Sequence, residues 1–494
     1  MKFIILNEKD NVAVALTDLK KNDSINTGNK EIIIRHDIET GHKIAIEDIP
    51  AGSDIIKYGH PVGHAAIQVH AGDHVHSHNL KTNLSGILEY SYVKKTGKND
   101  DPVSPPKINA FRRSNGDVGI RNELWIIPTV GCVNGTCDLI RAGFLEQNKA
   151  ERIDGVFVFP HNYGCSQLGD DHVNTRTILQ DMAMHPNAGA VLVVGLGCEN
   201  NQTDEFFKTM EEFDTDRIKA IVAQDYEDEI AAGIEILNQL YDEMKKDVRS
   251  ECSLSSLKIG LECGGSDALS GITANPLLGV FSNYMTNCGG TTVLTEVPEM
   301  FGAETFLMER AADEEVYDKI VSMINDYKDF FIKHDQEIYE NPSPGNKKGG
   351  ITTLEEKSLG AVEKSGKSEI KDVLKYGERI TSPGLQLLSA PGNDLVATTA
   401  LAASGCQMII FTTGRGTPFG GPVPTIKVST NTGLFKKKQN WIDFNAGALL
   451  ENKTMETLLK ELTEYVIMVA DGKETKNEKN GFRNLTIFKS GVTL

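Results

Sequence analysis

The sequence predicts an α/β protein in which a small all-β domain precedes larger domains built around parallel sheets. Short segments that alternate apolar and polar residues fill residues 1–90, for example 11–19 and 42–49, and turn-forming runs such as NTGN, ETG and PAG separate them. After Phe111, apolar runs alternate with long amphipathic segments, which is the pattern of βαβ units. The chain length of 494 residues fits about three domains of ~150 residues each.

The elements of the α/β part follow from the length and period of its apolar runs. Short continuous runs predict buried strands, and longer amphipathic stretches predict helices. Residues 340–369 have no convincing period, and a loop of about thirty residues predicts a flexible lid or a binding loop. We expect strands at 124–129, 155–159, 190–194, 258–261, 291–294, 385–388 and 408–411, and helices at 173–184, 227–246 and 303–333.

Two polar stretches mark the expected domain boundaries. Residues 91–108 are polar and contain prolines, so we expect an inter-domain linker after an N-terminal domain at 1–90. The charged stretch around residue 250 divides the remainder into a second α/β domain at 109–250 and a C-terminal domain at 251–494.

The composition argues against several classes of function. The chain has 51 Lys and Arg against 69 Asp and Glu, a formal charge of -18, and no basic cluster that could follow a phosphate backbone, so we expect no nucleic-acid partner. No apolar run approaches the ~20 residues of a membrane span, and the N-terminus lacks the apolar core of a signal peptide. The eight cysteines are scattered without a CxxC motif, which is typical of reduced thiols. We therefore expect a cytoplasmic protein that does not associate with membranes.

Histidines gather in the N-terminal domain. Eight of the twelve lie between His36 and His78, and the densest run is HAGDHVHSHN. If this run is extended, His74, His76 and His78 project from one face, because side chains alternate along a strand. Three imidazoles on one face can bind a divalent metal or an anionic substrate, and they can equally form a polar, solvent-facing edge.

Four cysteines each follow an apolar run that predicts a strand. In a parallel sheet, ligands bind outside the carboxyl ends of the strands, so these thiols could face one crevice close to His161 and Glu199. Soft thiolates select iron, zinc or an iron–sulfur cluster over magnesium. A single free cysteine is more often a small buried apolar residue. The four are Cys132, Cys165, Cys198 and Cys263.

A glycine-rich turn after the last predicted strand contains Arg415. Its sequence, TTGRGTPFGG, lets a ligand approach the backbone closely, and the guanidinium could hold a carboxylate through two parallel hydrogen bonds. The alternative is a tight turn with a solvated arginine. The run GLGCEN lacks the last glycine of a dinucleotide fingerprint, and the absence of GxSxG and Walker A motifs argues against a serine hydrolase and a P-loop nucleotidase.

Longer motifs along the whole chain resemble the altronate/galactarate dehydratase family. They include GHKIAI and HVHSHN near the N-terminus, then GDVGIRNELWIIPTVGCVN, HNYGCSQLGDDH and GLGCENN, and later ECGGSDALSGITANP, ENPSPGNKKGGITTLEEKSLG and TTGRGTPFGGPVPTIKVSTN. The resemblance is nearly end to end and keeps its order. It implies an N-terminal β-clip domain of the SAF type, a second domain that makes homodimer contacts, and a Rossmann-like C-terminal domain.

The resemblance also implies a chemistry. The reaction is the metal-dependent dehydration of a sugar acid, D-altronate to 2-dehydro-3-deoxy-D-gluconate and water in hexuronate catabolism, with galactarate as the alternative substrate. The implied cofactor is ferrous iron, with manganese as a possible replacement. Dehydration removes the proton at C2 and expels the hydroxyl at C3, so a cation that absorbs the developing negative charge would stabilise the transition state.

Our hypothesis assigns a role to each candidate residue. The iron, or an iron–sulfur centre, would bind at the strand ends of the α/β part, and the three imidazoles would close over it from the N-terminal domain. His161 would be the general base, with His42 and Lys43 as reserve acid/base groups, and Arg415 and Arg121 would hold the substrate carboxylate. The proposed metal ligands are Cys132, Cys165, Cys198, Cys263 and Glu199; the proposed substrate-binding imidazoles are His74, His76 and His78.

Two other classes of function remain open at this stage. A nicotinamide-dependent sugar-acid dehydrogenase would also use strand–turn–helix units, and it predicts saturable NAD binding. A non-catalytic sugar-acid or metal-binding protein predicts ligand binding without turnover.

Overall fold

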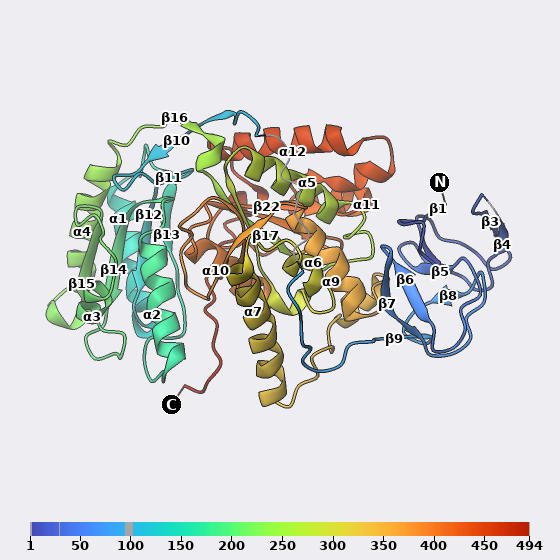
Figure 1. Ribbon diagram of the computed structural model, residues 1–494. Helices are drawn as coiled ribbons and strands as arrows, with labels where there is room; N and C mark the ends of the chain where they lie inside the picture. The colour runs from blue at the N-terminus through green and yellow to red at the C-terminus, as the bar shows by residue number, and fades with distance from the viewer. Residues whose placement is uncertain (1, 29, 94–101, 494) are drawn as a thin grey trace.

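The protein was analysed as a computed structural model that describes residues 2–28, 30–93 and 102–493 (Figure 1). Three parts follow one another in space, with the N-terminal domain at one end of the molecule, the second domain at the other end and the C-terminal domain between them. None of the helices in the described part of the chain combines the length and the apolar composition needed to cross a membrane.

The N-terminal domain consists of small antiparallel sheets, as the alternating pattern predicts. Buried valines, alanines and isoleucines of these short strands form its core, and β2 and β5 are buried on both faces. One sheet has the order β1-β2-β5-β8, a second has the order β6-β7-β9, and β3 and β4 form a hairpin. The strands are β1 Phe3–Ile4, β2 Val12–Ala15, β3 Ser24–Asn26, β4 Glu31–Ile33, β5 Lys43–Ala45, β6 Asp54–Lys57, β7 His60–Ala65, β8 His74–Val75 and β9 Leu80–Lys81.

The second domain surrounds a four-stranded parallel sheet of order β13-β12-β14-β15. Helices α1 and α4 cover one face of this sheet, and α2 covers the other. A small antiparallel sheet of order β11-β10-β16 lies where the chain enters and leaves the domain. The strands are β10 Lys107–Arg112, β11 Val118–Gly119, β12 Glu123–Pro128, β13 Gly155–Val158, β14 Ala188–Gly195, β15 Ile218–Val222 and β16 Ser250–Ser253; the helices are α1 Asn134–Gln147, α2 Asp170–Ala183, α3 Thr203–Lys208 and α4 Glu229–Met244.

The C-terminal domain contains a seven-stranded parallel sheet of order β19-β20-β18-β17-β21-β22-β23. From β17 the chain passes to β18 on one side, and it later returns to pair β21 with the opposite edge of β17. The strands are β17 Lys258–Cys263, β18 Thr291–Leu294, β19 Ile370–Leu374, β20 Gly384–Leu388, β21 Met408–Thr413, β22 Thr425–Ser429 and β23 Phe444–Asn445; the helices are α5 Ala274–Asn287, α6 Glu304–Met308, α7 Glu314–Lys333, α8 Pro344–Lys348, α9 Leu354–Val362, α10 Asp394–Ala403, α11 Thr432–Lys437, α12 Met455–Ala470 and α13 Lys476–Lys479.

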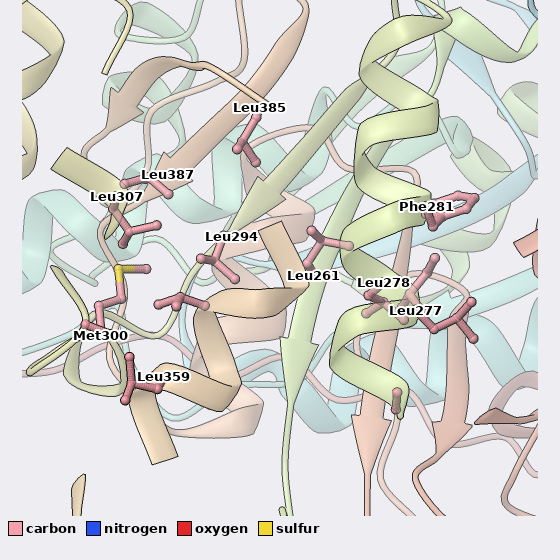
Figure 2. Packing of buried hydrophobic residues seen from close by; sticks show 14 of the residues in the cluster. Leu261, Leu277, Leu278, Phe281, Leu294, Met300, Leu307, Leu359, Leu385 and Leu387 are labelled. Atoms are coloured by element: carbon pink, nitrogen blue, oxygen red, sulfur yellow. The ribbon is translucent and has the colours of Figure 1, made fainter. Parts of the chain in front are cut away.

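Helices on both faces bury this sheet. Figure 2 shows Leu277 and Phe281 of α5 in the same apolar cluster as Leu261 of β17 and Leu294 of β18. On the other face, α10 and α2 share a cluster with strands of both parallel sheets. The second and C-terminal domains are therefore joined by a common apolar core.

The seven predicted strands of the α/β part all coincide with observed strands, whereas one predicted helix and one predicted loop need correction. The predicted helix 303–333 is divided into α6 and α7, because Ala311 between them pairs with Ile370 as an isolated bridge. The predicted loop 340–369 contains α8 and α9, each begun by a side-chain cap from Ser343 or Thr353. Of the expected linker, residues 94–101 lie outside the described residues, and β10 begins at Lys107.

A buried charge cluster attaches the N-terminal domain to the C-terminal domain. The ammonium groups of Lys43 and Lys57 lie 2.7 and 2.8 Å from the two carboxylate oxygens of Glu356 on α9, and none of the three side chains is more than 1% exposed. Lys43 also donates to the Gly350 carbonyl and the Thr352 hydroxyl. Although burial opposes its ionisation, the two ammonium groups lower the pKa of Glu356 to about 2. Burial lowers the pKa of Lys43 to about 8 against the attraction of Glu356.

Replacing Glu356 with glutamine is expected to lower the free energy of unfolding by about 3–5 kcal/mol, because two buried ammonium groups lose their counter-charge. Urea denaturation followed by circular dichroism measures this change. The control Lys20→Ala breaks an exposed ion pair with Asp37 and is expected to leave the denaturation curve unchanged. Equal effects of the two substitutions would contradict the role given to Glu356.

Candidate active site

Two loops meet at the carboxyl ends of β17 and β21, where the strand order of the large sheet reverses. The Gly265 carbonyl after β17 accepts hydrogen bonds from the backbone N–H groups of Gly414 and Arg415 after β21, at 3.1 and 3.0 Å. A Cβ atom on Gly414 would lie 2.1 Å from Cγ of Asp267, so this close approach requires glycine. A reversal of this kind is where open α/β sheets bind their ligands.

A groove of about 540 Å³ opens at these loops, between the N-terminal and C-terminal domains. A second hollow of about 320 Å³ adjoins it, and Lys348 at the end of α8 lines both. The walls therefore come from two domains that are far apart in the sequence. The groove is lined by Thr17, Gly41, Asp267, Arg415 and Asn431 among others, and the hollow by Asp37, Glu39, His42, His74, His76, Lys347 and Lys348.

Asp267 and Arg415 differ in whether their side chains have hydrogen-bond partners in the described part of the chain. The Asp267 carboxylate accepts hydrogen bonds from the hydroxyls of Thr430 and Ser270 and from the Asn431 amide, and burial raises its pKa. Arg415 is exposed, and its guanidinium forms no hydrogen bond or ion pair within the described ranges. Its planar set of donors is thus available to a carboxylate, as the sequence predicts for this residue.

Imidazoles of the N-terminal domain cluster beside Lys348. His42 precedes β5, which pairs with β8, the strand that carries His74, and this pairing brings their ring nitrogens to 3.0 Å. The His76 ring stacks on His42, with the centroids 5.1 Å apart, and the exposed His78 lies next to His74 with a centroid distance of 5.6 Å. The structure thus brings together all three imidazoles predicted to share a face and adds His42 to them.

Hydrogen bonds determine which ring nitrogens carry protons. His42 Nε2 lies 3.3 Å from the Lys348 carbonyl, and a carbonyl only accepts, so His42 donates from Nε2. In the neutral ring, Nδ1 must then accept from His74 Nε2, which leaves His74 Nδ1 as an unprotonated nitrogen. Burial and the neighbouring imidazoles lower the pKa of His74 to about 3, and burial also lowers the pKa of His42 and His76.

His76 has no comparable free nitrogen. Its Nε2 donates to the Lys347 carbonyl at 2.9 Å, and its Nδ1 accepts from the Ser77 hydroxyl at 3.0 Å. Together with the His42 contact, this bond ties the end of α8 to the imidazole cluster. His74 is therefore the member of this stack best suited to accept a proton.

A buried cluster of carboxylates lies at the carboxyl end of β17. Glu299 pairs with Lys357 at 2.6 Å and accepts from the Cys263 thiol at 3.1 Å, and Glu296 pairs with Lys364 at 3.1 Å. Neither carboxylate oxygen of Glu262 has a hydrogen-bond partner, and one oxygen of Glu296 also lacks one. Burial and neighbouring carboxylates raise the pKa of Glu262, and they raise the pKa of Glu296 to about 7.

These side chains fit a divalent cation. Within the described residues, two groups have ligand atoms within 4.8 Å of one another: Cys263, Glu296 and Glu299 in one, and Glu262, Glu296 and Asp394 in the other. The second group contains the unpartnered oxygens, and carboxylate oxygens are ligands for Fe²⁺ and Mn²⁺. A cation bound among them would compensate carboxylates that are otherwise costly to bury.

The other proposed metal ligands lie in the second domain, at the end of the molecule opposite the imidazoles (Figure 1). The expectation of one crevice for all four thiols is corrected by the topology, because Cys132, Cys165 and Cys198 follow strands of the four-stranded sheet and Cys263 ends a strand of the seven-stranded sheet. The two oxygens of Glu199 accept from Thr129 and from two backbone N–H groups of its own loop.

His161, Arg121 and Lys43 are occupied by other contacts. His161 lies in the second domain, donates from Nε2 to the Pro128 carbonyl and accepts at Nδ1 from the Tyr163 N–H, so it has no nitrogen for a base. Arg121 is buried and bonds Glu478 through two nitrogens and three carbonyls through the rest of its donors, so it cannot hold a substrate carboxylate. Lys43 attaches the domains, as described above.

Sequence reasoning did not select Lys347, Lys348, Asp267 or the three carboxylates at Glu262, Glu296 and Asp394. The segment PSPGNKKGG carried a usable signal, since Ser343 and Asn346 have the spacing of a reciprocal helix cap and place the two lysines at a helix end. The carboxylates carried none, because a buried acidic group cannot be told from an exposed one by residue type.

Comparison with known protein families gives a match for each of the three domains. Residues 1–83 match the altronate/galactarate dehydratase SAF domain, residues 110–245 match the second domain of D-galactarate dehydratase/altronate hydrolase, and residues 254–493 match the C-terminal domain of D-galactarate/altronate dehydratase. The three matches follow the order of the three parts of the structure.

Full-length relatives have the same assignment. The chain is 57% identical over 495 residues to an altronate dehydratase of Escherichia coli (strain K12), with 100% of both chains covered, and 54% identical over 494 residues to an altronate dehydratase of Bacillus subtilis (strain 168), with 100% and 99% covered. It is 33% identical over 506 residues to the galactarate dehydratase (L-threo-forming) of E. coli, with 98% and 96% covered. The chain therefore belongs to the altronate/galactarate dehydratase family and is a hydro-lyase.

Proposed function

We propose that this enzyme removes water from D-altronate to give 2-dehydro-3-deoxy-D-gluconate, a step of hexuronate catabolism. The observation that carries the proposal is the identity of 57% and 54% to two altronate dehydratases over the full length, against 33% to a galactarate dehydratase. The groove between the N-terminal and C-terminal domains would hold the sugar acid.

Arg415 would bind the substrate carboxylate at the rim of the groove. It has no partner within the described residues, and two parallel hydrogen bonds to a carboxylate match the geometry of its guanidinium. In an acidic protein, this arginine together with Lys348 supplies the local positive charge that an anionic substrate needs.

Proton transfers would be divided between His74 and Lys348. The C2–H bond breaks and its proton goes to His74 Nδ1, while His42 accepts the proton on His74 Nε2 in a hydrogen bond and so orients the ring. The C3–O bond breaks and the hydroxyl leaves as water with a proton from the Lys348 ammonium group. A double bond forms between C2 and C3, and the resulting enol tautomerises to the 2-keto acid.

We propose ferrous iron as the cofactor, with manganese as a replacement, bound by Glu262, Glu296 and Asp394. Two features support this choice: the unpartnered oxygens of Glu262 and Glu296, and the mutual approach of the three carboxylates within 4.8 Å. A divalent cation there would supply electrostatic stabilisation of the charge that develops when C2 loses its proton.

We further propose a cytoplasmic homodimer that uses the second domain for its contacts. All eight cysteines are free, and three of them are not buried, which suits a reducing compartment. The second domain also exposes large apolar side chains, including Leu139 on α1 and Leu168 before α2.

A substrate panel tests the function. Anaerobic protein with Fe²⁺ is expected to convert altronate to a 2-keto-3-deoxy acid, detected with thiobarbiturate, at a kcat/KM at least about tenfold above the values for galactarate, mannonate and sulfolactate. Treatment with a chelator should remove activity, and Fe²⁺ or Mn²⁺ should restore it. Turnover of galactarate in preference to altronate would refute the substrate, and NAD reduction would indicate a dehydrogenase.

Arg415→Lys is expected to raise KM for altronate about tenfold, because one ammonium group replaces a two-point hydrogen bond to the carboxylate. Initial rates at increasing altronate concentration measure this change. Lys436→Arg on α11 is a control outside the groove lining and should leave KM unchanged. An unchanged KM in Arg415→Lys would exclude this arginine from carboxylate binding.

The pH profile tests the base. Since burial and neighbouring imidazoles lower the pKa of His74 to about 3, the reactive neutral form persists as the pH falls past the ordinary imidazole value of about 6.5. The acid limb of kcat/KM should therefore lie well below that value. His74→Asn should reduce kcat by about 10²–10⁴-fold; a limb at the ordinary value together with an active variant would assign the base elsewhere.

A further inference from the structure

Three cysteines converge at one edge of the second domain. Strands β13, β12 and β14 are neighbours in the sheet and parallel, and the loops after them carry Cys165, Cys132 and Cys198. Backbone bonds hold these loops together: the Gly131 N–H donates to the Tyr163 carbonyl at 2.9 Å, and the Asn201 N–H donates to the Gly164 carbonyl at 3.0 Å.

These three thiols differ from the other five in exposure. Cys132 and Cys198 are exposed and Cys165 is partly exposed, whereas the other five cysteines, including Cys263, are buried. Free cysteine is usually a small buried apolar residue, and the five buried thiols fit that description. The thiols at the second-domain edge are the ones that an external ligand can reach.

The loops that carry Cys165 and Cys198 contain residues with positive φ angles. Gly164 and Ser166 flank Cys165 with φ angles of 100° and 56°, and Gly197 precedes Cys198 with φ 124°. A Cβ atom on Gly164 would lie 2.1 Å from the Thr129 carbonyl oxygen. Ser166 is the one non-glycine residue among them, and a left-handed φ at such a residue is frequent at ligand sites.

Neighbouring contacts give these loops a fixed shape. Cys132 lies in the turn Gly131–Val133 that leads directly into α1. The Gln224 amide donates to the Cys198 sulfur at 3.7 Å. The three hydrogen bonds to Glu199 fix the loop that carries Cys198, so this carboxylate positions a ligand instead of acting as one.

The separation of the sulfurs argues against a site for a single metal ion. These thiols are not among the described groups whose ligand atoms lie within 4.8 Å of one another, so they do not form a ready site for a single tetrahedral ion. A polynuclear cluster needs thiolates that stand further apart, because several iron atoms lie between them. Since both nitrogens of His161 and both oxygens of Glu199 are engaged, the neighbouring loops offer no obvious fourth ligand.

We propose that Cys132, Cys165 and Cys198 bind a [4Fe–4S] cluster through three thiolates, with the fourth iron open to a non-protein ligand. This cluster is distinct from the cation proposed at Glu262 and from the groove, because its cysteines follow strands of the second domain, whereas Glu262 and the groove belong to the C-terminal and N-terminal domains. The proposal therefore does not depend on the identity of the sugar acid.

Anaerobic reconstitution of the full chain with equal parts of ferrous and ferric iron and a matching amount of sulfide tests the site. The wild type is expected to contain acid-labile sulfide, with iron in excess of the sulfide by the ion proposed at Glu262, and to show a broad visible absorption that dithionite bleaches. The labile sulfide content should fall by at least about tenfold in each of the variants Cys132→Ser, Cys165→Ser and Cys198→Ser. The matched control Cys288→Ser removes a buried thiol of the C-terminal domain and should retain it.

A second measurement on the wild type is independent of the folding of any variant. Before reconstitution, iodoacetamide should modify these three cysteines and spare the five buried ones, as read by peptide mass spectrometry; after reconstitution the three should be protected. Absence of labile sulfide in the wild type, zinc binding without iron, unprotected thiols, or a cluster retained in the three serine variants would each overturn the proposal.

Discussion

The geometry of the groove depends on one buried interaction, the shared contact of Glu356 with Lys43 and Lys57. The imidazoles belong to the N-terminal domain and Arg415 to the C-terminal domain, so the relative position of these domains sets the distance between the proposed proton acceptor and the proposed carboxylate-binding group. Glycines complete the junction: a Cβ atom on Gly350 would lie 2.5 Å from the Gly41 carbonyl oxygen. The ion pairs fix the orientation of the N-terminal domain, and the glycines allow the two backbones to approach closely.

Two clusters of buried charged side chains, around Glu356 and around Glu262, differ in how completely their charges are compensated. Around Glu356, two ammonium groups and one carboxylate satisfy each other by direct contact. Around Glu262, carboxylates outnumber the nearby lysines that pair with them, and unpartnered oxygens remain. A satisfied cluster serves attachment, whereas an unsatisfied one is costly unless a cation or a proton compensates it. Whether a buried carboxylate has its partners therefore indicates a structural or a chemical role more clearly than its residue type does.

The sequence predicted the strands well because buried parallel strands are continuous apolar runs, a local property. It could not predict which strands share a sheet, and so the four cysteine-ended runs were assigned to one crevice although β17 belongs to a different sheet from β12, β13 and β14. The same limit applies to single residues. Arg121 looked available next to a strand, but its partner Glu478 lies 357 positions away.

The polar composition of one segment also led to a wrong prediction for part of the candidate site. The polar composition of 340–369 indicated a loop, yet capping side chains start two helices there and tertiary contacts bury Glu355 and Glu356. In contrast, the grouping of His74, His76 and His78 was predicted from strand alternation and is observed, although β8 ends at Val75 and a turn carries the last two rings to their neighbours.

The attachment through Glu356 has a consequence for how the chain can be divided. Because specific side chains dock the N-terminal domain, the peptide connection mainly raises the local concentration of one domain at the other. Such an arrangement tolerates a break in the connecting segment, provided that the two pieces meet at sufficient concentration. The groove between the two domains would then be an interface between subunits, and the fraction of assembled grooves would vary with the abundance of both pieces.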